Sequence, residues 1–392
     1  MRLLSGFRVL DLGTFITAPY AAMLLAELGA DVVKIERPEG GDPFRWFSGG
    51  KSSPHFQAHN RHKRSIALDI TVPRGREVLH QLIASADALV LNVRPGVEAR
   101  LGLDEATLRR LNPRLVFCYI TGFGAEGPYA RRAAYDNVGQ AISGFLHRFH
   151  AGTDPRVAGP AISDAATGIF AALGLMGALL ERSRTGIGRK VEVNMVEATL
   201  ALAIEPLAQV FTTGTDQPHF QRSAYSQAYI LTCADGNRIA LQMSSVAKFW
   251  QGLAAVIEQP DLLRRYPDRH SLVSNYDRIA LELAAIFAAR PRAEWLQRLE
   301  RHDVPFVAEC RLSELEDDPH VRQLDLFHDL PDPAGGTVRS VRRAIRIDGS
   351  REIDHRAPPL LGQHTAEILT EIGLGKAEID ALATTGIVKL AG

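Results

Sequence analysis

The sequence predicts an α/β fold in which a large domain built on a parallel β-sheet is joined to a smaller α+β domain. Two observations support this prediction. Over about the first 200 residues, short β-branched runs alternate with helical patterns, and from about Ala224 the chain changes to adjacent strands followed by several helices. With 392 residues and about 150 residues per domain, two or three domains are expected.

The strands of the large domain are predicted from short apolar runs separated by amphipathic segments. This alternation indicates βαβ units, whose parallel strands are buried on both faces. The first crossover helix is expected over Ala18 to Gly29, because glycine often follows the last residue of a helix. The result is a Rossmann-like sheet. The runs are FRVLDLG, DVVKIE, SIALDI, ADALVLNV, RLVFCYITGFG and RKVEVNM.

The smaller domain begins with AYILTCADGNRIALQM, which reads as two strands joined at an Asp-Gly turn. Helical patterns follow at 247–257, 276–289 and 292–301. The tail holds a Gly/Pro-rich turn, PDPAGGTV, a strand-like RRAIRI and a helical pair over Thr365 to Ala383. We expect it to return to the large domain. The predicted boundaries are 1–215 for the first part of the large domain, 216–325 for the inserted small domain and 326–392 for the returning segment.

Composition excludes several classes of protein. Hydrophobic residues make up 46% and charged residues 23%, which is ordinary for a globular protein. Forty-five basic residues balance 45 acidic ones, so the chain lacks the basic excess of a nucleic-acid binder. No leader or span of about 20 apolar residues is recognised, which predicts no membrane association. The separated Cys118, Cys233 and Cys310 predict neither a disulfide framework nor a metal site, and favour the cytoplasm.

Two motifs, one rich in glycine and one with an acidic residue, do not by themselves identify the ligand. GFGAEG matches GxGxxG, but it does not follow the first strand and is not followed by a small, apolar helix start, so a nicotinamide oxidoreductase is a remote alternative. Glu36 and Arg37 end the second predicted strand, where an arginine suits a phosphate and a glutamate a ribose. A solvated surface pair fits equally well. Basic residues near other strand ends indicate a cationic rim for a polyphosphate: Arg61, Lys63, Arg64, Arg94, Arg100, Arg131 and Arg132.

Asp164 precedes a long, almost uncharged helical stretch, ISDAATGIFAALGLMGALLER. Aspartate is among the best N-cap residues, so capping is one interpretation. The other is a nucleophilic carboxylate that helix amides keep ionised at a pocket. The pattern alone fits both.

Taken together, these motifs make the chain resemble the class III coenzyme A-transferases of the CaiB/BaiF type, which include formyl-CoA:oxalate and crotonobetainyl-CoA:carnitine CoA-transferases. The resemblance covers nearly the whole chain. It is carried by GFRVLDLG, LLAELGADVVKIERPEGGDPFR, NRHKRSIALDI, NVRPGVEARLGL, NPRLVFCYITGFGAEGPYARRAAYDNVGQAISG, SDAATGIFAALGLMGALLERSRTGIGRKVEVNM and APPLLGQHTAEILTEIGL.

The resemblance implies that Asp164 is the nucleophile of a transferase that moves CoA from an acyl-CoA to a carboxylic acid, through an aspartyl anhydride and an aspartyl-CoA thioester. CoA thioesters are substrates, and no permanently bound cofactor or metal is expected. An interlocked homodimer is also implied. Arg37, Lys63 and Arg100 match CoA-facing positions, and Ile16, Thr17 and Ala18 match the backbone loop beside the thioester.

This sequence departs from the family pattern at positions that bear on the choice of substrate. Ala133 replaces a lysine that some members carry, for which Arg131 or Arg132 is a substitute. Tyr135 and Arg222 are expected at the acceptor pocket, where Arg222 suits the second carboxylate of a small dicarboxylic acid.

The same fold supports α-methylacyl-CoA racemases and acyl-CoA isomerases, which need two proton-transfer groups. Tyr135 stands where racemases have a histidine, and Val246 where they have a glutamate. A phenol is a poor general base at neutral pH, so transfer is favoured. A CoA-binding protein without catalysis is the remaining alternative. The identities of donor and acceptor are not predicted.

Overall fold

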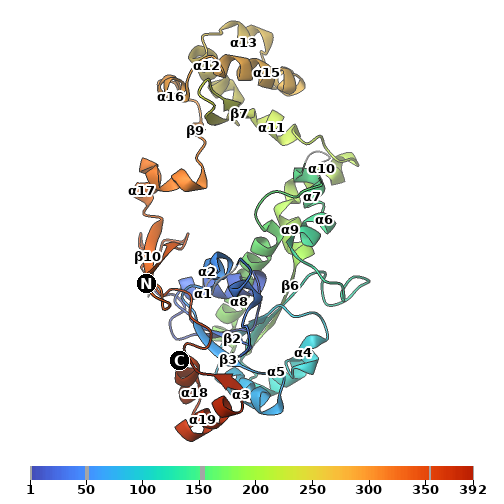
Figure 1. Cartoon of the computed structure of the whole chain (residues 1–392). Helices are drawn as coiled ribbons and strands as arrows, with labels where there is room; N and C mark the ends of the chain where they lie inside the picture. The colour runs from blue at the N-terminus through green and yellow to red at the C-terminus, as the bar shows by residue number, and fades with distance from the viewer. Residues whose placement is uncertain (1, 49–52, 151–154, 353–354, 392) are drawn as a thin grey trace. The chain divides into compact units, whose positions relative to one another are not determined.

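The computed structural model describes residues 2–48, 53–150, 155–352 and 355–391. The chain divides into two compact units (Figure 1). Residues 1–205 and 325–392 form the first unit, and residues 206–324 form the second. The first boundary therefore lies before the predicted residue 215, at the start of helix α10 (Ile204–Thr213).

The first unit is built on a seven-stranded sheet in the order β12-β3-β2-β1-β4-β5-β6. Neighbouring strands are parallel except β12, which pairs antiparallel with β3. The order reverses between β1 and β4, and open α/β sheets commonly bind ligands in a crevice at the carboxyl ends of the strands beside such a reversal. The bounds are β1 Arg8–Asp11, β2 Asp31–Glu36, β3 Arg64–Leu68, β4 Ala88–Leu91, β5 Val116–Thr121, β6 Lys190–Asn194 and β12 Val388–Lys389.

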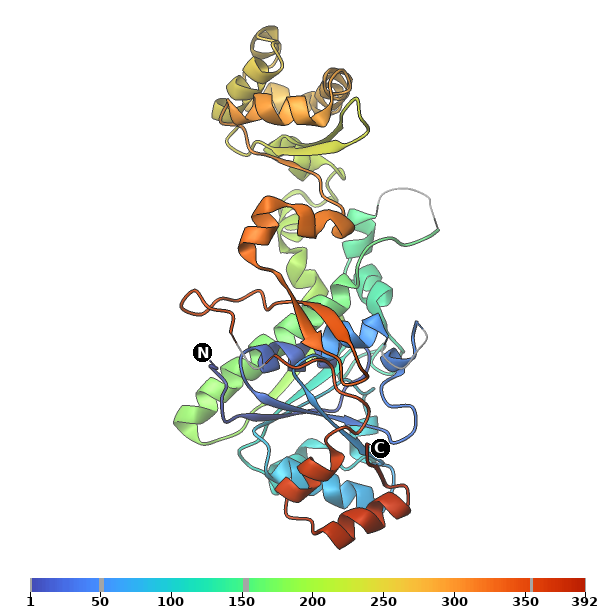
Figure 2. The ribbon, with the colours of Figure 1, turned by 60° about the vertical axis from the view of Figure 1, so that its left-hand side comes forward.

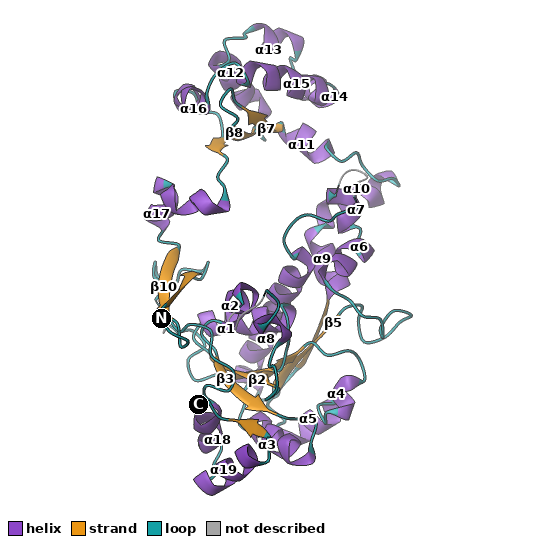
Figure 3. Ribbon diagram, in the orientation of Figure 1, coloured by secondary structure: helices purple, strands orange, loops and turns teal. Residues whose placement is uncertain are grey.

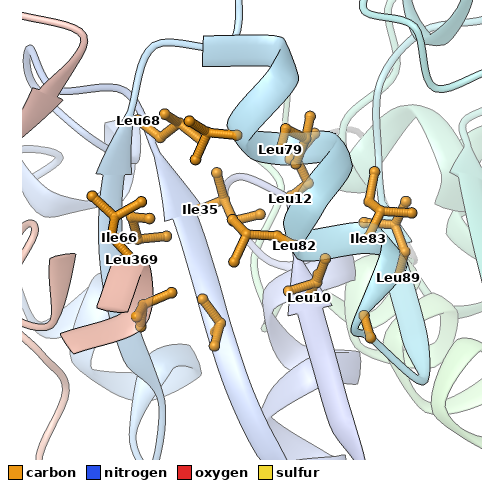
Figure 4. Packing of buried hydrophobic residues seen from close by; sticks show 14 of the residues in the cluster. Leu10, Leu12, Ile35, Ile66, Leu68, Leu79, Leu82, Ile83, Leu89 and Leu369 are labelled. Atoms are coloured by element: carbon orange, nitrogen blue, oxygen red, sulfur yellow. The ribbon is translucent and has the colours of Figure 1, made fainter. Parts of the chain in front are cut away.

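Helices cover both faces of this sheet (Figure 2). Residues alternate along each strand, so Val9 packs under α1 and α8 while Leu10 packs under the opposite layer. Figure 4 shows that opposite layer, where leucines and isoleucines of the strands meet those of α3. The first layer contains α1 (Thr17–Glu27) and α8 (Ile162–Thr185), and the second contains α3 (Pro73–Ala84), α5 (Glu105–Leu111), α18 (Thr365–Glu371) and α19 (Lys376–Thr384).

These elements confirm the predicted parallel α/β core and the return of the tail. The six predicted strands are present, and Gly29 follows α1 with φ +100°, a left-handed conformation that favours glycine. The strand prediction for Arg342 to Ile347 is wrong. The strand there is β11 (Thr337–Val341), which pairs with β10 (Phe327–Pro331) across the Gly/Pro-rich turn.

Helix α8 is long and apolar enough to cross a membrane by length and composition, as is the bent pair α9 (Met195–Leu202) and α10 taken together. This corrects the prediction that no segment reaches such a length. In the structure, one side of α8 is buried against α1 and the sheet through Ala171, Leu175 and Leu179.

The first unit also contains η1 (Pro43–Arg45), α2 (Pro54–Asn60), α4 (Val97–Arg100), α6 (Asp136–Ile142) and α7 (Phe145–Phe149).

The second unit contains a three-stranded antiparallel sheet in the order β7-β8-β9 with its own apolar core (Figure 3). The predicted Asp-Gly hairpin is confirmed as β7 (Ala228–Thr232) and β8 (Arg238–Gln242). The other elements are α11 (Gln221–Ser226), α12 (Val246–Val256), α13 (Asp261–Arg265), α14 (Arg269–Ser274), α15 (Tyr276–Phe287), α16 (Arg292–Glu300), β9 (Phe306–Ala308), η2 (Leu312–Asp317) and α17 (Pro319–Leu324).

Candidate active site

A cavity of about 210 Å³ lies at the carboxyl ends of β1, β4 and β5. Its walls are residues 14–17 after β1, 92–95 after β4, 120–122 at the end of β5, and 130 and 132–135, together with Asp164 and Met195. This is the crevice that the reversal of strand order opens, where open α/β sheets bind their ligands. The cavity therefore brings together Asp164, Ile16, Thr17 and Tyr135, four of the residues singled out from the sequence.

Asp164 lies in the first turn of α8 and is half-buried. The N-cap residue of α8 is Ala161, and the Asp164 side chain makes no capping bond. The cap comes from Asp136, at the start of α6. Its Oδ1 accepts hydrogen bonds from the amides of Ser163 at 2.8 Å and Asp164 at 3.3 Å. The capping interpretation of Asp164 is therefore wrong, because another carboxylate already satisfies these amides and leaves the side chain of Asp164 at the cavity.

Helix α8 reaches the start of α1 by a close contact at Gly168. A Cβ atom at this position would lie 2.9 Å from Cδ1 of Tyr20 and 3.0 Å from the carbonyl oxygen of Thr17. Only glycine permits this approach without a shift. Since Asp164 lies one helical turn before Gly168, the contact sets the carboxylate beside the first turn of α1.

The surroundings raise the pKa of Asp164 to about 7. Burial of the carboxyl group is the larger cause, and the negative charge of Asp136 adds to it. We expected helix amides to keep Asp164 ionised. That expectation is wrong for the amides of Ser163 and Asp164, because both donate to Asp136 instead.

The backbone amides of Ile16, Thr17 and Ala18 begin α1, and none of them donates to an acceptor within the described parts of the chain. Pro19 follows and has no N–H group. Ile16 and Thr17 line the cavity, whereas Ala18 is fully buried. Of the three predicted loop residues, Ile16 and Thr17 therefore offer unpaired donors to a ligand of the cavity.

The predicted CoA-binding cations are in different environments. Arg37 is exposed after β2, and Arg100 is exposed at the end of α4. Neither lines the cavity. The ammonium of Lys63 is fully buried, and it donates to Asp11 Oδ2, Pro19 O and Asn60 Oδ1 at 2.7–2.8 Å. All three donors of Lys63 are thus used inside the protein, so the prediction that it faces CoA is not met in this structure.

Glu36 likewise departs from both of its predicted roles. Its carboxylate is buried and accepts two hydrogen bonds from Arg45, at 2.7 and 2.8 Å. It is therefore neither a ribose ligand nor half of a solvated pair with Arg37. No sequence pattern indicated this, because the guanidinium that neutralises Glu36 is that of Arg45, nine residues further along the chain in η1.

Two arginines that the sequence analysis named only as part of a cationic rim also line the cavity. Arg94 follows β4, and Arg132 lies above the ring of Tyr129, 3.9 Å from its centroid. Arg131 does not line the cavity, although Ala133 does. The signal for Arg94 was its place directly after a predicted strand.

Tyr135 is largely exposed and meets Phe15 edge-on, with ring centroids 5.7 Å apart. Arg222 and Val246 belong to the second unit. Arg222 is exposed on α11, and Val246 is buried in the core of that unit.

The fold and the cavity define an α/β protein with a carboxylate, unpaired backbone amides and arginines around one crevice, an arrangement suited to anionic acyl substrates. The model of CoA-transferase family III matches residues 4–365. The chain therefore belongs to CoA-transferase family III and is a class III CoA-transferase that acts on CoA thioesters.

Similar proteins cover nearly the whole chain. Succinyl-CoA:glutarate CoA-transferase of Mus musculus is 31% identical, over 99% of this chain and 91% of its own length. Formyl-CoA:oxalate CoA-transferase of Streptomyces avermitilis is 31% identical, over 98% of this chain and 99% of its own. The crystal structure of a CaiB/BaiF family protein from Brucella suis has a TM-score of 0.82 and 28% identity, over 94% of this chain and 99% of that one.

Proposed function

We propose that this transferase works by covalent catalysis at Asp164 and that its acceptor is a small dicarboxylic acid. The observation that carries the proposal is the carboxylate of Asp164 in one cavity with the unpaired amides of Ile16 and Thr17. A nucleophile next to preorganised donors is the arrangement that acyl transfer requires.

In the first half-reaction, a carboxylate oxygen of Asp164 attacks the thioester carbonyl, and the C–S bond breaks. This gives an aspartyl-acyl anhydride and CoA thiolate. The thiolate then attacks the side-chain carbonyl of Asp164, and the C–O bond to the donor acyl group breaks. The donor acid leaves as a carboxylate, and an aspartyl-CoA thioester remains.

The second half-reaction reverses these steps with the acceptor. Its carboxylate attacks the aspartyl thioester and releases CoA thiolate, which then attacks the acceptor carbonyl and frees Asp164. Every attacking and leaving group is an anion, so the steps balance without a net proton transfer. The amides of Ile16 and Thr17 would donate to the oxyanion of each tetrahedral intermediate.

The raised pKa of Asp164 supports a nucleophilic role. A carboxylate that is poorly solvated and lies beside another negative charge is a stronger base than one in water. Bond formation to an acyl group therefore stabilises this carboxylate more than it would stabilise a carboxylate in water, because the negative charge is dispersed. Binding of substrates that displace water strengthens this effect.

The dicarboxylic acceptor is supported by the cations of the cavity and by similar proteins. Arg94 and Arg132 line the same cavity as Asp164, so the first carboxylate can react while the second pairs with a guanidinium. Relatives named for glutarate, mesaconate and oxalate are 30–31% identical to this chain. Tyr135 lines the cavity as well, and Arg222 remains a proposed acceptor residue from the second unit.

The acceptor proposal is tested with a matched pair of variants. Arg132→Ala should raise the KM for a dicarboxylic acceptor such as glutarate about tenfold or more, because it removes a charge-assisted contact. Arg131→Ala removes an adjacent, exposed arginine that does not line the cavity, and should leave this KM unchanged. Equal effects of both substitutions would assign the role to general surface charge instead.

We also propose that CoA is held by two exposed arginines, Arg37 directly after β2 and Arg100 at the end of α4. A homodimer is proposed from an apolar row on α8, where Ile169, Leu173 and Leu180 are 48%, 58% and 63% exposed. Sedimentation of the purified protein tests the dimer.

A cytoplasmic location is proposed because the three cysteines are unpaired.

Trapping the covalent intermediate tests the catalytic proposal. The protein is mixed with succinyl-CoA, and its intact mass is measured with and without hydroxylamine. An adduct that hydroxylamine removes and that maps to the peptide of Asp164 is expected. Exchange of the α-proton of an acyl-CoA with deuterated water, without an adduct, would instead favour the racemase alternative.

A further inference from the structure

A cluster of fully buried charges from separate parts of the chain bonds to the loop that lines the active-site cavity. It is here called the ion cluster and consists of Asp11 of β1, Lys34 of β2, Asp42 before η1 and Lys63 before β3. Their side chains have no exposed surface. Lys34 lies 2.9 Å from Asp42 and 3.6 Å from Asp11, and Lys63 lies 2.8 Å from Asp11. Two cations and two anions therefore neutralise one another in the protein interior.

The ion cluster also binds the backbone of the loop that leads into α1. Asp11 accepts from the amide of Gly13 at 3.0 Å, and Lys34 donates to the carbonyl of Gly13 at 2.9 Å. Asp42 accepts from the amide of Phe15 at 3.2 Å. Lys63 donates to the carbonyl of Pro19 at 2.7 Å. Asp11, Lys34 and Asp42 thus bond to the loop, and Lys63 bonds to the first turn of α1, in addition to their partner charges.

The conformation held in this way is one that the loop would not readily adopt alone. Phe15 has φ +63°, a left-handed value that costs a residue with a Cβ atom about 1 kcal/mol or more. The same loop is pinned at its other side by Asn92, which exchanges two hydrogen bonds with Thr14, at 2.8 and 3.0 Å. The next amides, those of Ile16 and Thr17, are the unpaired donors of the cavity.

We propose that the ion cluster is a positioning device for catalysis: its hydrogen bonds fix Gly13 and Phe15, so that the amides of Ile16 and Thr17 face the reacting carbonyl beside Asp164. The proposal rests on the covalent function proposed above. Its members are positioning residues and do not touch the substrate. The cluster is buried so that water cannot compete for the loop's backbone groups, and a displacement of about 1 Å in such a site is sufficient to lower the rate about 100-fold.

Asp42 provides the sharpest test because it joins Lys34 to the amide of Phe15. Asp42→Ala should lower kcat about 100-fold while the KM for succinyl-CoA changes less than about threefold, since no ligand contact is lost. Asp42→Asn retains an oxygen for the amide of Phe15 and should lose less. Should the alanine variant fail to fold, the asparagine variant carries the test alone, with an expected loss of about tenfold in kcat.

A matched control separates positioning from general destabilisation. Asp87 also accepts from a backbone amide, that of Arg8 at 2.7 Å, and pairs with the buried Arg182 at 2.7 Å. It lies before β4 and does not line the cavity. Asp87→Ala should therefore lower the melting temperature yet leave kcat within about twofold of the wild type, measured well below either melting temperature.

The rate of adduct formation distinguishes this proposal from the catalytic one. In the Asp42 variants, Asp164 should still be acylated by succinyl-CoA, but about 10- to 100-fold more slowly. A wild-type protein that never forms the adduct would contradict the covalent function. Adduct formation in the wild type, together with a wild-type kcat in Asp42→Ala, would overturn the positioning role alone, as would equal losses of kcat in the Asp42→Ala and Asp87→Ala variants.

Discussion

Replacing Asp164 by asparagine should inactivate the enzyme and at the same time stabilise its fold. The carboxyl group has an ordinary pKa of 3.8, and burial and Asp136 raise its pKa to about 7 in the folded protein. At about 1.4 kcal/mol for each tenfold change in proton affinity, this difference corresponds to about 4 kcal/mol. The side chain accepts no hydrogen bond from the described residues, so asparagine removes the charge without breaking a bond.

The sign follows from where the proton is bound. Below pH 3.8 both the folded and the unfolded chain hold the proton, and the group has no effect on stability. As the pH rises towards 7, the unfolded chain has released the proton and the folded chain still holds it, so the free energy of unfolding falls. Above 7 the full cost is present. The stabilisation by Asp164→Asn should therefore grow by about 2–3 kcal/mol between pH 5 and pH 8.

Urea unfolding of the wild type and of Asp164→Asn at pH 5, 6, 7 and 8 measures this difference. Asp216→Asn serves as the control for the loss of one negative charge, because Asp216 is exposed. An asparagine variant that is less stable than the wild type at pH 8, or whose advantage does not depend on pH, would refute the reasoning. The site would then hold its carboxylate without a cost in stability.

Three further predictions concern neighbouring contacts. Asp136→Asn removes the negative charge beside Asp164 and should move the rise of kcat/KM with pH to lower pH; an unchanged profile would leave burial as the sole cause. Arg37→Ala should raise the KM for succinyl-CoA with little change in kcat, which initial rates measure; an unchanged KM would separate this arginine from CoA. Gly168→Ala should lower both kcat and the melting temperature, because its methyl group would lie 2.9 Å from Tyr20; full activity would show that α1 and α8 can separate freely.

The fold was largely predictable because its signals are local. A parallel strand buried on both faces must be almost entirely apolar, so runs such as ALVL at 88–91 can be recognised as strands from the sequence. An Asp-Gly turn between alternating runs is sufficient to specify a hairpin. The prediction of a strand at RRAIRI was wrong. An alternating pattern shows that a strand is possible, but it does not show whether a neighbouring strand is available to pair with it.

The sequence singled out Asp164, which the structure places at the cavity, but it did not show the contacts that surround this residue. Asp136 and Asp164 are 28 residues apart, so the cap of α8 could not be seen in its own sequence. Lys63 resembled the other basic residues near it, but its partner Asp11 lies 52 residues away, in β1. Whether a cation is exposed to ligand or buried against a carboxylate depends on such distant pairs, which composition and spacing do not report.

The pairing of β12 with β3 has a consequence for biosynthesis. The sheet of the first unit is completed by Val388 and Lys389, whereas the whole of the second unit, residues 206–324, precedes them in the chain. On the ribosome, the second unit can therefore fold while the edge of the first sheet still lacks its last strand. Until synthesis reaches that strand, β3 is an open edge, and this is the stage at which a nascent chain is most exposed to mispairing with another copy.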